Sequence, residues 1–281
     1  MESLKDKTIF VTGASRGIGR AIAVRAAKDG ANVVVAAKTD RPHPKLPGTI
    51  HSVAKDVVSQ GGNALAVRCD IRDEDQVTNA VIRAVERFGG IDVLVNNAGA
   101  ISLTGTLETP MKRYDLMMDV NTRGSYLCAR ACLPHLLKSS NPHILMLSPP
   151  IDPDPRWFRD HTAYTMSKYG MSLCVIGLAG EFREAGVAVN ALWPRSVIAT
   201  SALLALGGKV RPQNCRSPEI VADAARAILR RDSRTCTGNH FLDEDVLAQE
   251  GITDLDRYAL DPGEPLQSDL FVEPPFPDSQ A

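Results

Sequence analysis

The stretch from Thr8 to Ile22, TIFVTGASRGIGRAI, decides how the rest of the chain is read. It starts with a short apolar run, typical of a strand buried on both faces, and then passes through three glycines into a helical pattern. Glycine permits a tight turn and a close approach of the backbone to a ligand. A helix that begins there offers free N–H groups and the positive end of its dipole to a phosphate. The stretch therefore predicts a phosphate-binding turn.

The spacing of these glycines, TGxxxGxG, differs from the GxGxxG of many dinucleotide-binding turns. No GK[ST] follows, so a nucleoside-triphosphate loop is disfavoured. The alternative reading is a tight strand-to-helix turn that binds nothing. The loop residues expected to contact a cofactor are Gly13, Ser15, Arg16, Gly17, Ile18 and Gly19.

Beyond this turn, short apolar runs alternate with longer helical patterns. The alternation predicts an α/β fold, a doubly wound parallel sheet with right-handed crossovers and helices on both faces. The expected strands are 8–12, 32–37, 64–69, 92–97, 143–148, 187–192 and 239–242. The expected helices are 17–29, 50–60, 73–88, 110–138, 162–185 and 218–230.

The length and composition suit one large domain or two small ones, since the chain has 281 residues, of which 44% are hydrophobic and 23% charged. We interpret it as a single domain over 1–281 with its core in 7–245. Residues 39–49, TDRPHPKLPGT, form an insertion after the second strand. The Pro-rich tail 261–281 is either a wrap on the surface or partly disordered.

Composition also argues against several classes of protein. The formal net charge is −1 without a basic stripe, so nucleic acid is not an expected partner. No apolar run approaches the ~20 residues needed to cross a bilayer, and the first residues do not resemble a signal peptide. The six cysteines include no CxxC pair, which fits a reduced, cytoplasmic setting and predicts no metal site.

The end of the second strand indicates which dinucleotide binds. An acidic residue there would accept hydrogen bonds from the ribose 2′-OH of NAD, whereas a basic residue accommodates a 2′-phosphate. Here the strand ends with Ala36 and Ala37, and Lys38 follows. Arg16 of the glycine loop adds a second cation. The alternative is two ordinary surface cations, but the pattern favours NADP(H) over NAD(H).

Tyr164 and Lys168 are four residues apart in a helical pattern and so share one face of the helix. A free phenol has a pKa of ~10, which is poorly placed for acid–base work near neutral pH. A neighbouring ammonium favours the phenolate and should lower that pKa. The pair is thus a candidate for proton transfer to or from a substrate oxygen. The alternative is a coincidental pair on an exposed helix.

Four motifs in this order resemble a short-chain dehydrogenase/reductase of the single-domain type over residues 7–245. They are TGASRGIG at 12–19, NNAG at 96–99, Asn121 within DVNTRGS, and YxxxK at 164–168. The segments SPP, WF, NALWP and HPKLPGTI are similar to the catalytic half of the hydroxysteroid dehydrogenase-like protein 2 family.

The resemblance implies a Rossmann-type sheet of about seven parallel strands and a homodimer or homotetramer. The expected substrate is a small-molecule carbonyl or alcohol, and the aromatic pair Trp157 and Phe158 favours an apolar one. It also assigns roles. Tyr164 donates or accepts the proton, and Lys168 holds the nicotinamide ribose. Asn121 organises a water relay. Three more residues meet the cofactor: Asp70 at the adenine, Asn97 along the channel, and Val197 through its backbone at the nicotinamide amide.

Two departures from the family pattern affect the expected site. The usual serine, 13 residues before the tyrosine, is replaced by Ile151, and alignment on the strand puts Pro149 in its place. Ser148 is the candidate that remains, although a one-residue shift would turn it away unless a bulge restored it. Arg195 replaces a glycine and could bind an acidic substrate group or a surface carboxylate.

The loop 149–160 is expected to fold over the nicotinamide end of the site. We expect Trp157 and Phe158 to face the substrate, although they could instead pin the loop down. The leading hypothesis is an NADP(H)-dependent oxidoreductase that acts on a carbonyl or alcohol. The alternative is a nucleotide-binding protein with little turnover, and the presence of Asn121, Tyr164 and Lys168 favours the enzyme.

Overall fold

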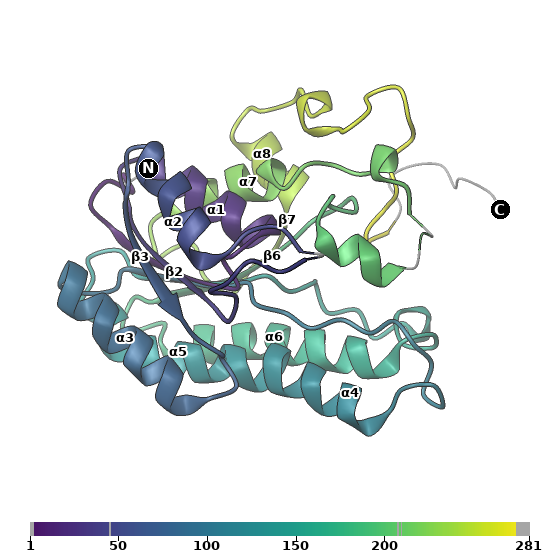
Figure 1. Cartoon of the computed structure of the whole chain (residues 1–281), viewed down its shortest axis with the longest axis horizontal. Coiled ribbons are helices and arrows are strands. Elements are labelled where there is room, and N and C mark those ends of the chain that lie inside the picture. The colour runs from purple at the N-terminus through teal and green to yellow at the C-terminus, as the bar shows by residue number, and fades with distance from the viewer. Residues whose placement is uncertain (1–2, 45, 207, 209, 274–281) are drawn as a thin grey trace.

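The computed structural model describes residues 3–44, 46–206, 208 and 210–273 (Figure 1). The predicted seven-stranded parallel sheet is confirmed, with the strand order β3-β2-β1-β4-β5-β6-β7. Each strand lies within two residues of its expected bounds. The strands are β1 (Thr8–Thr12), β2 (Asn32–Ala37), β3 (Asn63–Arg68), β4 (Val93–Asn96), β5 (His143–Met146), β6 (Ala188–Trp193) and β7 (His240–Leu242).

Helices cover both faces of this sheet (Figure 1). One apolar layer lies under α1, α2, α7 and α8, and the other lies under α3, α5 and α6. The short α8 was not expected, because its seven residues are too few to show a helical period. The α-helices are α1 (Gly17–Ala27), α2 (Ile50–Ser59), α3 (Glu74–Phe88), α4 (Met111–Met117), α5 (Gly124–Leu136), α6 (Thr162–Glu181), α7 (Glu219–Leu229) and α8 (Asp243–Gln249).

The strand order places a functional crevice at the carboxyl ends of β1 and its neighbours. The chain runs outward from β1 to β2 and β3, and then returns to β4 on the other side of β1. Such a reversal leaves a gap between the flanking connections, which is where open α/β sheets bind ligands. In the parallel register Thr12 lies opposite Ala36, so the glycine loop and Lys38 leave the sheet at the same edge.

The region expected as one helix over 110–138 is instead interrupted. A π-helical segment, Met118–Arg123, lies between α4 and α5 and contains Asn121. The wider turn changes which way side chains point relative to a regular helix, and π turns are frequent at functional sites. Asn121 is fully buried. The sequence pattern predicted the helix but not this interruption.

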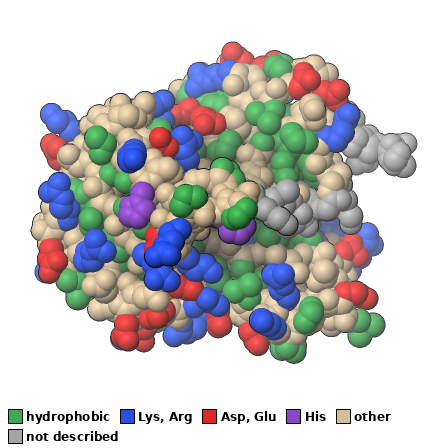
Figure 2. All heavy atoms as spheres, in the orientation of Figure 1, with side chains coloured by type: hydrophobic (Ala, Val, Ile, Leu, Met, Phe, Trp, Pro, Cys, Tyr) green, Lys and Arg blue, Asp and Glu red, His purple; other side chains and the backbone are tan. Residues whose placement is uncertain are grey.

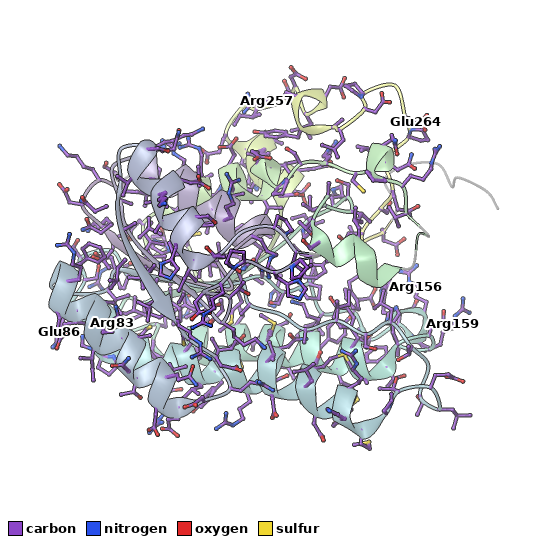
Figure 3. The ribbon with its side chains drawn as sticks, viewed as in Figure 1. Arg83, Glu86, Arg156, Arg159, Arg257 and Glu264 are labelled. Atoms are coloured by element: carbon purple, nitrogen blue, oxygen red, sulfur yellow. The ribbon has the colours of Figure 1, made fainter. Side chains whose placement is uncertain are left out.

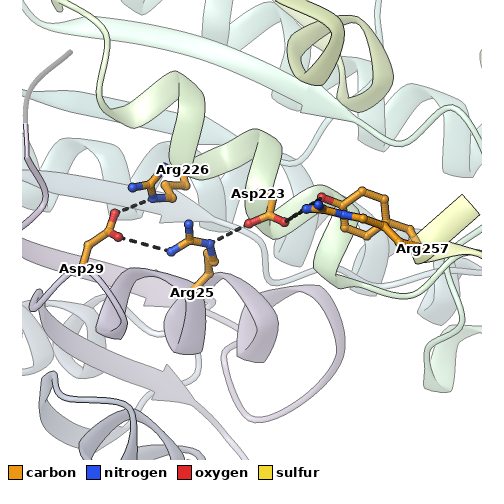
Figure 4. Close-up of polar contacts among 6 residues, drawn as sticks. Arg25, Asp29, Asp223, Arg226 and Arg257 are labelled. Atoms are coloured by element: carbon orange, nitrogen blue, oxygen red, sulfur yellow. Dashed lines mark hydrogen bonds and ion pairs between the residues drawn. The ribbon is translucent and has the colours of Figure 1, made fainter. Parts of the chain in front are cut away.

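Ion pairs join α1 to α7 at one side of the molecule (Figure 4). Arg25 contacts Asp223 at 2.6 Å and Asp29 at 3.3 Å, and Arg226 contacts Asp29 at 2.5 Å. Arg257 extends the chain of contacts to Asp223 at 3.4 Å. Because these side chains remain partly exposed, we regard the network as fixing the orientation of α7 more than as a large source of stability.

The visible face of the molecule carries basic and acidic side chains interspersed with one another (Figure 2). Within the described part of the chain, no helix has the length and apolarity that a membrane span requires.

Candidate active site

One continuous cleft runs along the carboxyl edge of the sheet. Its first part is bordered by the glycine loop and by the ends of β2 and β3, and its second part by Tyr164, Lys168 and Trp193. The two parts share several lining residues, among them Ile18, Asn97 and Thr200. The cleft therefore connects the predicted phosphate-binding turn directly to the predicted acid–base pair.

The glycine loop is shaped as a cradle that side chains would fill. Gly13 has φ +65°, and a Cβ there would lie 2.7 Å from the Cα of Ala98. A Cβ on Gly19 would lie 2.4 Å from Nδ2 of Asn97. Asn97 braces the loop by donating from Nδ2 to the carbonyl oxygen of Thr12 at 2.9 Å.

Arg16 at the N-cap of α1 makes no capping hydrogen bond with its side chain, so the first turn of the helix can meet an anion. Ser15, Gly17 and Ile18 line the cleft beside this turn, whereas Gly19 is buried behind it. The loop thus fits the pyrophosphate of a dinucleotide.

The two predicted cations take different positions. Arg16 lines the cleft but also holds the insertion 39–49, donating from Nε to the carbonyl oxygen of Pro47 at 2.9 Å. Lys38 lines the same region with 62% of its side chain exposed, and its Nζ lies 4.0 Å from Asp70. Asp70 also lines the cleft, and hydrogen bonds from Arg72 hold the pKa of its carboxyl below the usual value.

Tyr164 and Lys168 both lie in the wall of the second part of the cleft. They extend from α6 and are almost completely buried by the surrounding protein. The phenol oxygen of Tyr164 has no hydrogen-bond partner within the described residues, so it is available to a ligand. Lys168 donates from Nζ to the carbonyl oxygen of Leu147 at 2.5 Å, and its ammonium lies 4.9 Å from the ring centre of Trp193.

Burial, not the neighbouring ammonium, dominates the pKa of the phenol. The pKa of Tyr164 is raised because burial disfavours the phenolate and because the negative charge of Asp269 lies nearby. Burial also lowers the pKa of Lys168 to about 7, although Asp269 opposes that shift. The expected lowering of the Tyr164 pKa is therefore not found. The spacing of Tyr164 and Lys168 predicts a neighbouring ammonium, but it does not predict how deeply the phenol is buried.

Asn121 is held by three hydrogen bonds of its side chain. Its Oδ1 accepts from the backbone N–H of Ala100 at 2.8 Å, and its Nδ2 donates to the carbonyl oxygen of Ala100 at 2.9 Å and to Ser167 Oγ at 2.8 Å. The side chain thereby fixes Ala100, which lines the cleft. The water relay expected of Asn121 stays a prediction.

Ser148 does not face the cleft. Its hydroxyl is fully buried and has no hydrogen-bond partner among the described residues, and the neighbouring Leu147 lines the cleft instead. Successive residues of an extended chain point to opposite sides, so the one-residue shift turns Ser148 away from the cleft that Leu147 lines. The geometry therefore gives no support to the catalytic role predicted for Ser148.

The loop 149–160 packs on α6 rather than roofing the substrate. Trp157 donates from Nε1 to Asp152 at 2.8 Å, and the ring of Phe158 meets that of Tyr169 edge-on at 5.5 Å. Neither Trp157 nor Phe158 is among the described residues that line the cleft. The prediction that they face the substrate is therefore not supported. The alternative, that these two rings hold the loop in place, fits the contacts.

Arg195 binds surface carboxylates, the second of the two alternatives left open by its sequence. Its guanidinium lies 2.8 Å from Asp245 and 3.5 Å from Glu244. Val197 lines the cleft, but its backbone N–H donates to the carbonyl oxygen of Gln267 at 2.9 Å. Only its carbonyl oxygen, which also accepts from Arg216, is left for the expected contact with a nicotinamide amide.

Sequence reasoning missed one wall of the site, which the C-terminal segment Gln267–Phe271 provides. Gln267, Ser268, Asp269 and Leu270 all line the cleft near Tyr164. The described part of the tail is thus a wrap that reaches the active site, whereas 274–281 lie outside the described residues. The only signal was the apolar run LFV within a Pro-rich stretch, which does not say where that run docks.

The chain resembles known proteins in both sequence and fold. The model of the short chain dehydrogenase family matches residues 7–205. The hydroxysteroid dehydrogenase-like protein 2 of Danio rerio is 59% identical over 95% of the chain, which covers 64% of that relative's length. The crystal structure of a putative dehydrogenase from Xanthomonas campestris is 60% identical, with a TM-score of 0.95 over 97% of this chain and all of that one. A metagenomic short-chain oxidoreductase solved in complex with NADP is 28% identical, with a TM-score of 0.70 over 86% of this chain and 97% of that one.

Proposed function

The chain belongs to the short-chain dehydrogenase family, and from that premise we propose that it transfers hydride between NADP(H) and a small, apolar carbonyl or alcohol. The observation that carries this proposal is the single cleft that joins the glycine loop to Tyr164 and Lys168. Apolar side chains such as Ile101, Leu103 and Leu203 surround the second part of this cleft, which favours an apolar substrate.

Tyr164 acts as the general acid in the direction of reduction. The cofactor supplies the hydride that adds to the carbonyl carbon. Tyr164 gives its phenolic proton to the carbonyl oxygen, and in oxidation it takes the proton back from the substrate hydroxyl. Lys168 offsets the phenolate charge that forms, and its ammonium is positioned by the carbonyl oxygen of Leu147.

Preference for NADP(H) rests on the chemistry at the end of β2. Ala36 and Ala37 are found where an acidic residue would be expected for NAD, and the side chain of Lys38 is largely exposed beside the cleft. An exposed ammonium can pair with a 2′-phosphate, whereas an NAD-selective site would offer a carboxylate to the ribose.

Self-association is supported by apolar side chains on the outside of α5 and α6. Tyr126, Met166, Leu173 and Ile176 are between 44% and 59% exposed. Such residues on neighbouring helices are more typical of the interface of a homodimer or homotetramer than of a solvated surface.

All six cysteines are free thiols, which fits the reduced cytoplasm.

The test is to measure the Kd of NADPH and of NADH and to follow NADPH oxidation with a panel of aldehydes and ketones. We expect tighter binding of NADPH and turnover of at least one apolar carbonyl compound. Tight NADPH binding without oxidation by any panel member would favour the alternative, a nucleotide-binding protein with little turnover.

A further inference from the structure

The C-terminal segment Gln267–Phe271 is fixed to the active site through its backbone. The carbonyl oxygen of Gln267 accepts from Val197 at 2.9 Å, and the N–H of Asp269 donates to the carbonyl oxygen of Arg195 at 3.0 Å. The indole N–H of Trp193 donates to the carbonyl oxygen of Leu270 at 2.8 Å. These bonds span the segment and set which side chains face the cleft.

Phe271 anchors the end of this segment. Its ring is 3% exposed and lies within 6.2 Å, centre to centre, of the rings of Trp157, His161, Tyr164, Tyr169 and Trp193. Its φ is +69°, a value that bulky residues rarely adopt. Backbone strain of this kind persists only where the surroundings determine the conformation, and it is concentrated at functional sites.

An ion pair adds a further link from the loop 149–160. Arg156 contacts Glu273, just beyond Phe271, and also Asp152. Figure 3 shows Arg156 at the periphery of the molecule, away from the sheet. The segment is therefore held on its outer side as well.

Asp269 lines the part of the cleft that Tyr164 and Lys168 also line, and its charge acts on both of them. One of its oxygens, Oδ1, accepts from the N–H of Leu270 at 2.7 Å. The other, Oδ2, has no hydrogen-bond partner within the described residues. Asp269 therefore brings a carboxyl oxygen without a described hydrogen-bond partner to this part of the cleft, which Ser148 does not line.

The charged and titratable groups around Asp269 come from several elements. Tyr164 and Lys168 face it from α6, Asp243 from the start of α8, and Cys215 from the segment before α7. Burial raises the pKa of Asp269 to about 7, and the charge of Asp243 adds to that effect while Lys168 opposes it. Near neutral pH the carboxyl group is thus protonated for part of the time.

We propose that protonated Asp269 donates a hydrogen bond to the substrate oxygen that Tyr164 protonates. This inference rests on the proposed function and supplies the second donor that Ser148 does not provide. A carboxylic acid kept neutral by an apolar site can serve as such a donor. Asp269 keeps its proton throughout, because the proton that adds to the substrate oxygen comes from Tyr164. Loss of one donor of this kind typically costs about 10²–10³ in rate.

The pH dependence follows from the protonation state. The donor is present below the pKa of Asp269 and is lost as the pH rises through about 7. Asp269→Asn offers an amide N–H at every pH and keeps an oxygen for Leu270. The rate of reduction by Asp269→Asn relative to wild type should therefore rise about tenfold between pH 6 and pH 8. Asp269→Asn also removes the charge that raises the pKa of Lys168. The earlier loss of the ammonium in this variant would lower the ratio as the pH rises, so Lys168 cannot produce the expected increase.

The experiment compares Asp269→Asn, Asp269→Ala and wild type, with Asp75→Asn on the exposed face of α3 as a control for the charge change. At pH 6 we expect near wild-type kcat for Asp269→Asn and a loss of about 100-fold for Asp269→Ala. The Kd of NADPH should stay unchanged in both. An equal loss of kcat in both variants would show that a carboxylate is needed. A wild-type kcat in Asp269→Ala would show that Asp269 touches no reacting atom. Either result overturns the proposal.

A second measurement does not need turnover. Infrared difference spectra of wild type minus Asp269→Asn should show the carbonyl stretch of a protonated carboxyl group at pH 6 and its loss at pH 8. Absence of this band at pH 6 overturns the proposal by itself. Failure of the proposed function looks different, because wild type would then reduce no carbonyl compound while the band remained.

Discussion

Replacing Phe271 with alanine tests whether this ring holds the C-terminal segment on the active site. The ring is 3% exposed and borders five other rings, so its removal leaves a cavity that the surrounding aromatic groups cannot easily fill. Phe→Ala changes at such positions cost about 3–5 kcal/mol. At roughly 2 °C per kcal/mol for a chain of this size, Tm should fall by about 6–10 °C.

The backbone conformation adds a second comparison at the same position. Because φ is +69°, alanine retains the strain of phenylalanine, whereas glycine relieves it. Phe271→Gly should therefore be no less stable than Phe271→Ala, although glycine is the worse choice at ordinary positions by about 0.5–1 kcal/mol. This reversal separates the effect of the backbone from that of the lost ring.

The assay combines thermal unfolding with hydrogen exchange at residues 261–273 and with KM for an active carbonyl substrate. Leu260→Ala is the control, since Leu260 precedes the segment and is 48% exposed. We expect faster exchange throughout 261–273 and a raised KM in Phe271→Ala only. A Tm and an exchange pattern indistinguishable from those of Leu260→Ala would refute the reasoning that Phe271 anchors this wall.

Two further predictions concern the cofactor and the assembly. Lys38→Asp should weaken NADPH binding by about 1.5–3 kcal/mol and move the preference toward NADH, while Lys55→Asp on α2 should do neither. Calorimetric titration of both variants with both cofactors measures this, and unchanged selectivity would contradict the role of Lys38. Leu173→Glu should lower the molar mass by light scattering, whereas Val58→Glu on α2, with the same 59% exposure, should not. An unaltered mass in Leu173→Glu would remove α6 from the interface.

The features that the sequence predicted correctly are local ones. The glycine turn depends on Gly13, Gly17 and Gly19 lying between one strand and one helix, a pattern that one short stretch contains, although Asn97 braces the turn from outside it. Tyr164 and Lys168 share a face because they are one helical turn apart. The order of strands and helices follows from hydrophobic runs, since parallel strands buried on both faces are apolar throughout.

The features that the sequence could not predict depend on packing between distant segments. Asp269 and Phe271 meet Tyr164 from more than 100 residues away, and no periodicity marks where a Pro-rich segment docks. The direction of Ser148 depends on a single-residue register at a strand end. The pKa of Tyr164 depends on burial, which is set by the whole domain and not by the spacing of two residues.

The central claim is that Tyr164 exchanges a proton with the substrate at the inner end of the cleft. It is tested most directly by comparing Tyr164→Phe with wild type in a single turnover of bound NADPH with an active carbonyl substrate. We predict an unchanged Kd for NADPH and a rate of NADPH oxidation lower by about 10²–10⁴-fold, the usual contribution of a general acid. A Tyr164→Phe protein that oxidises NADPH at most of the wild-type rate would contradict the account.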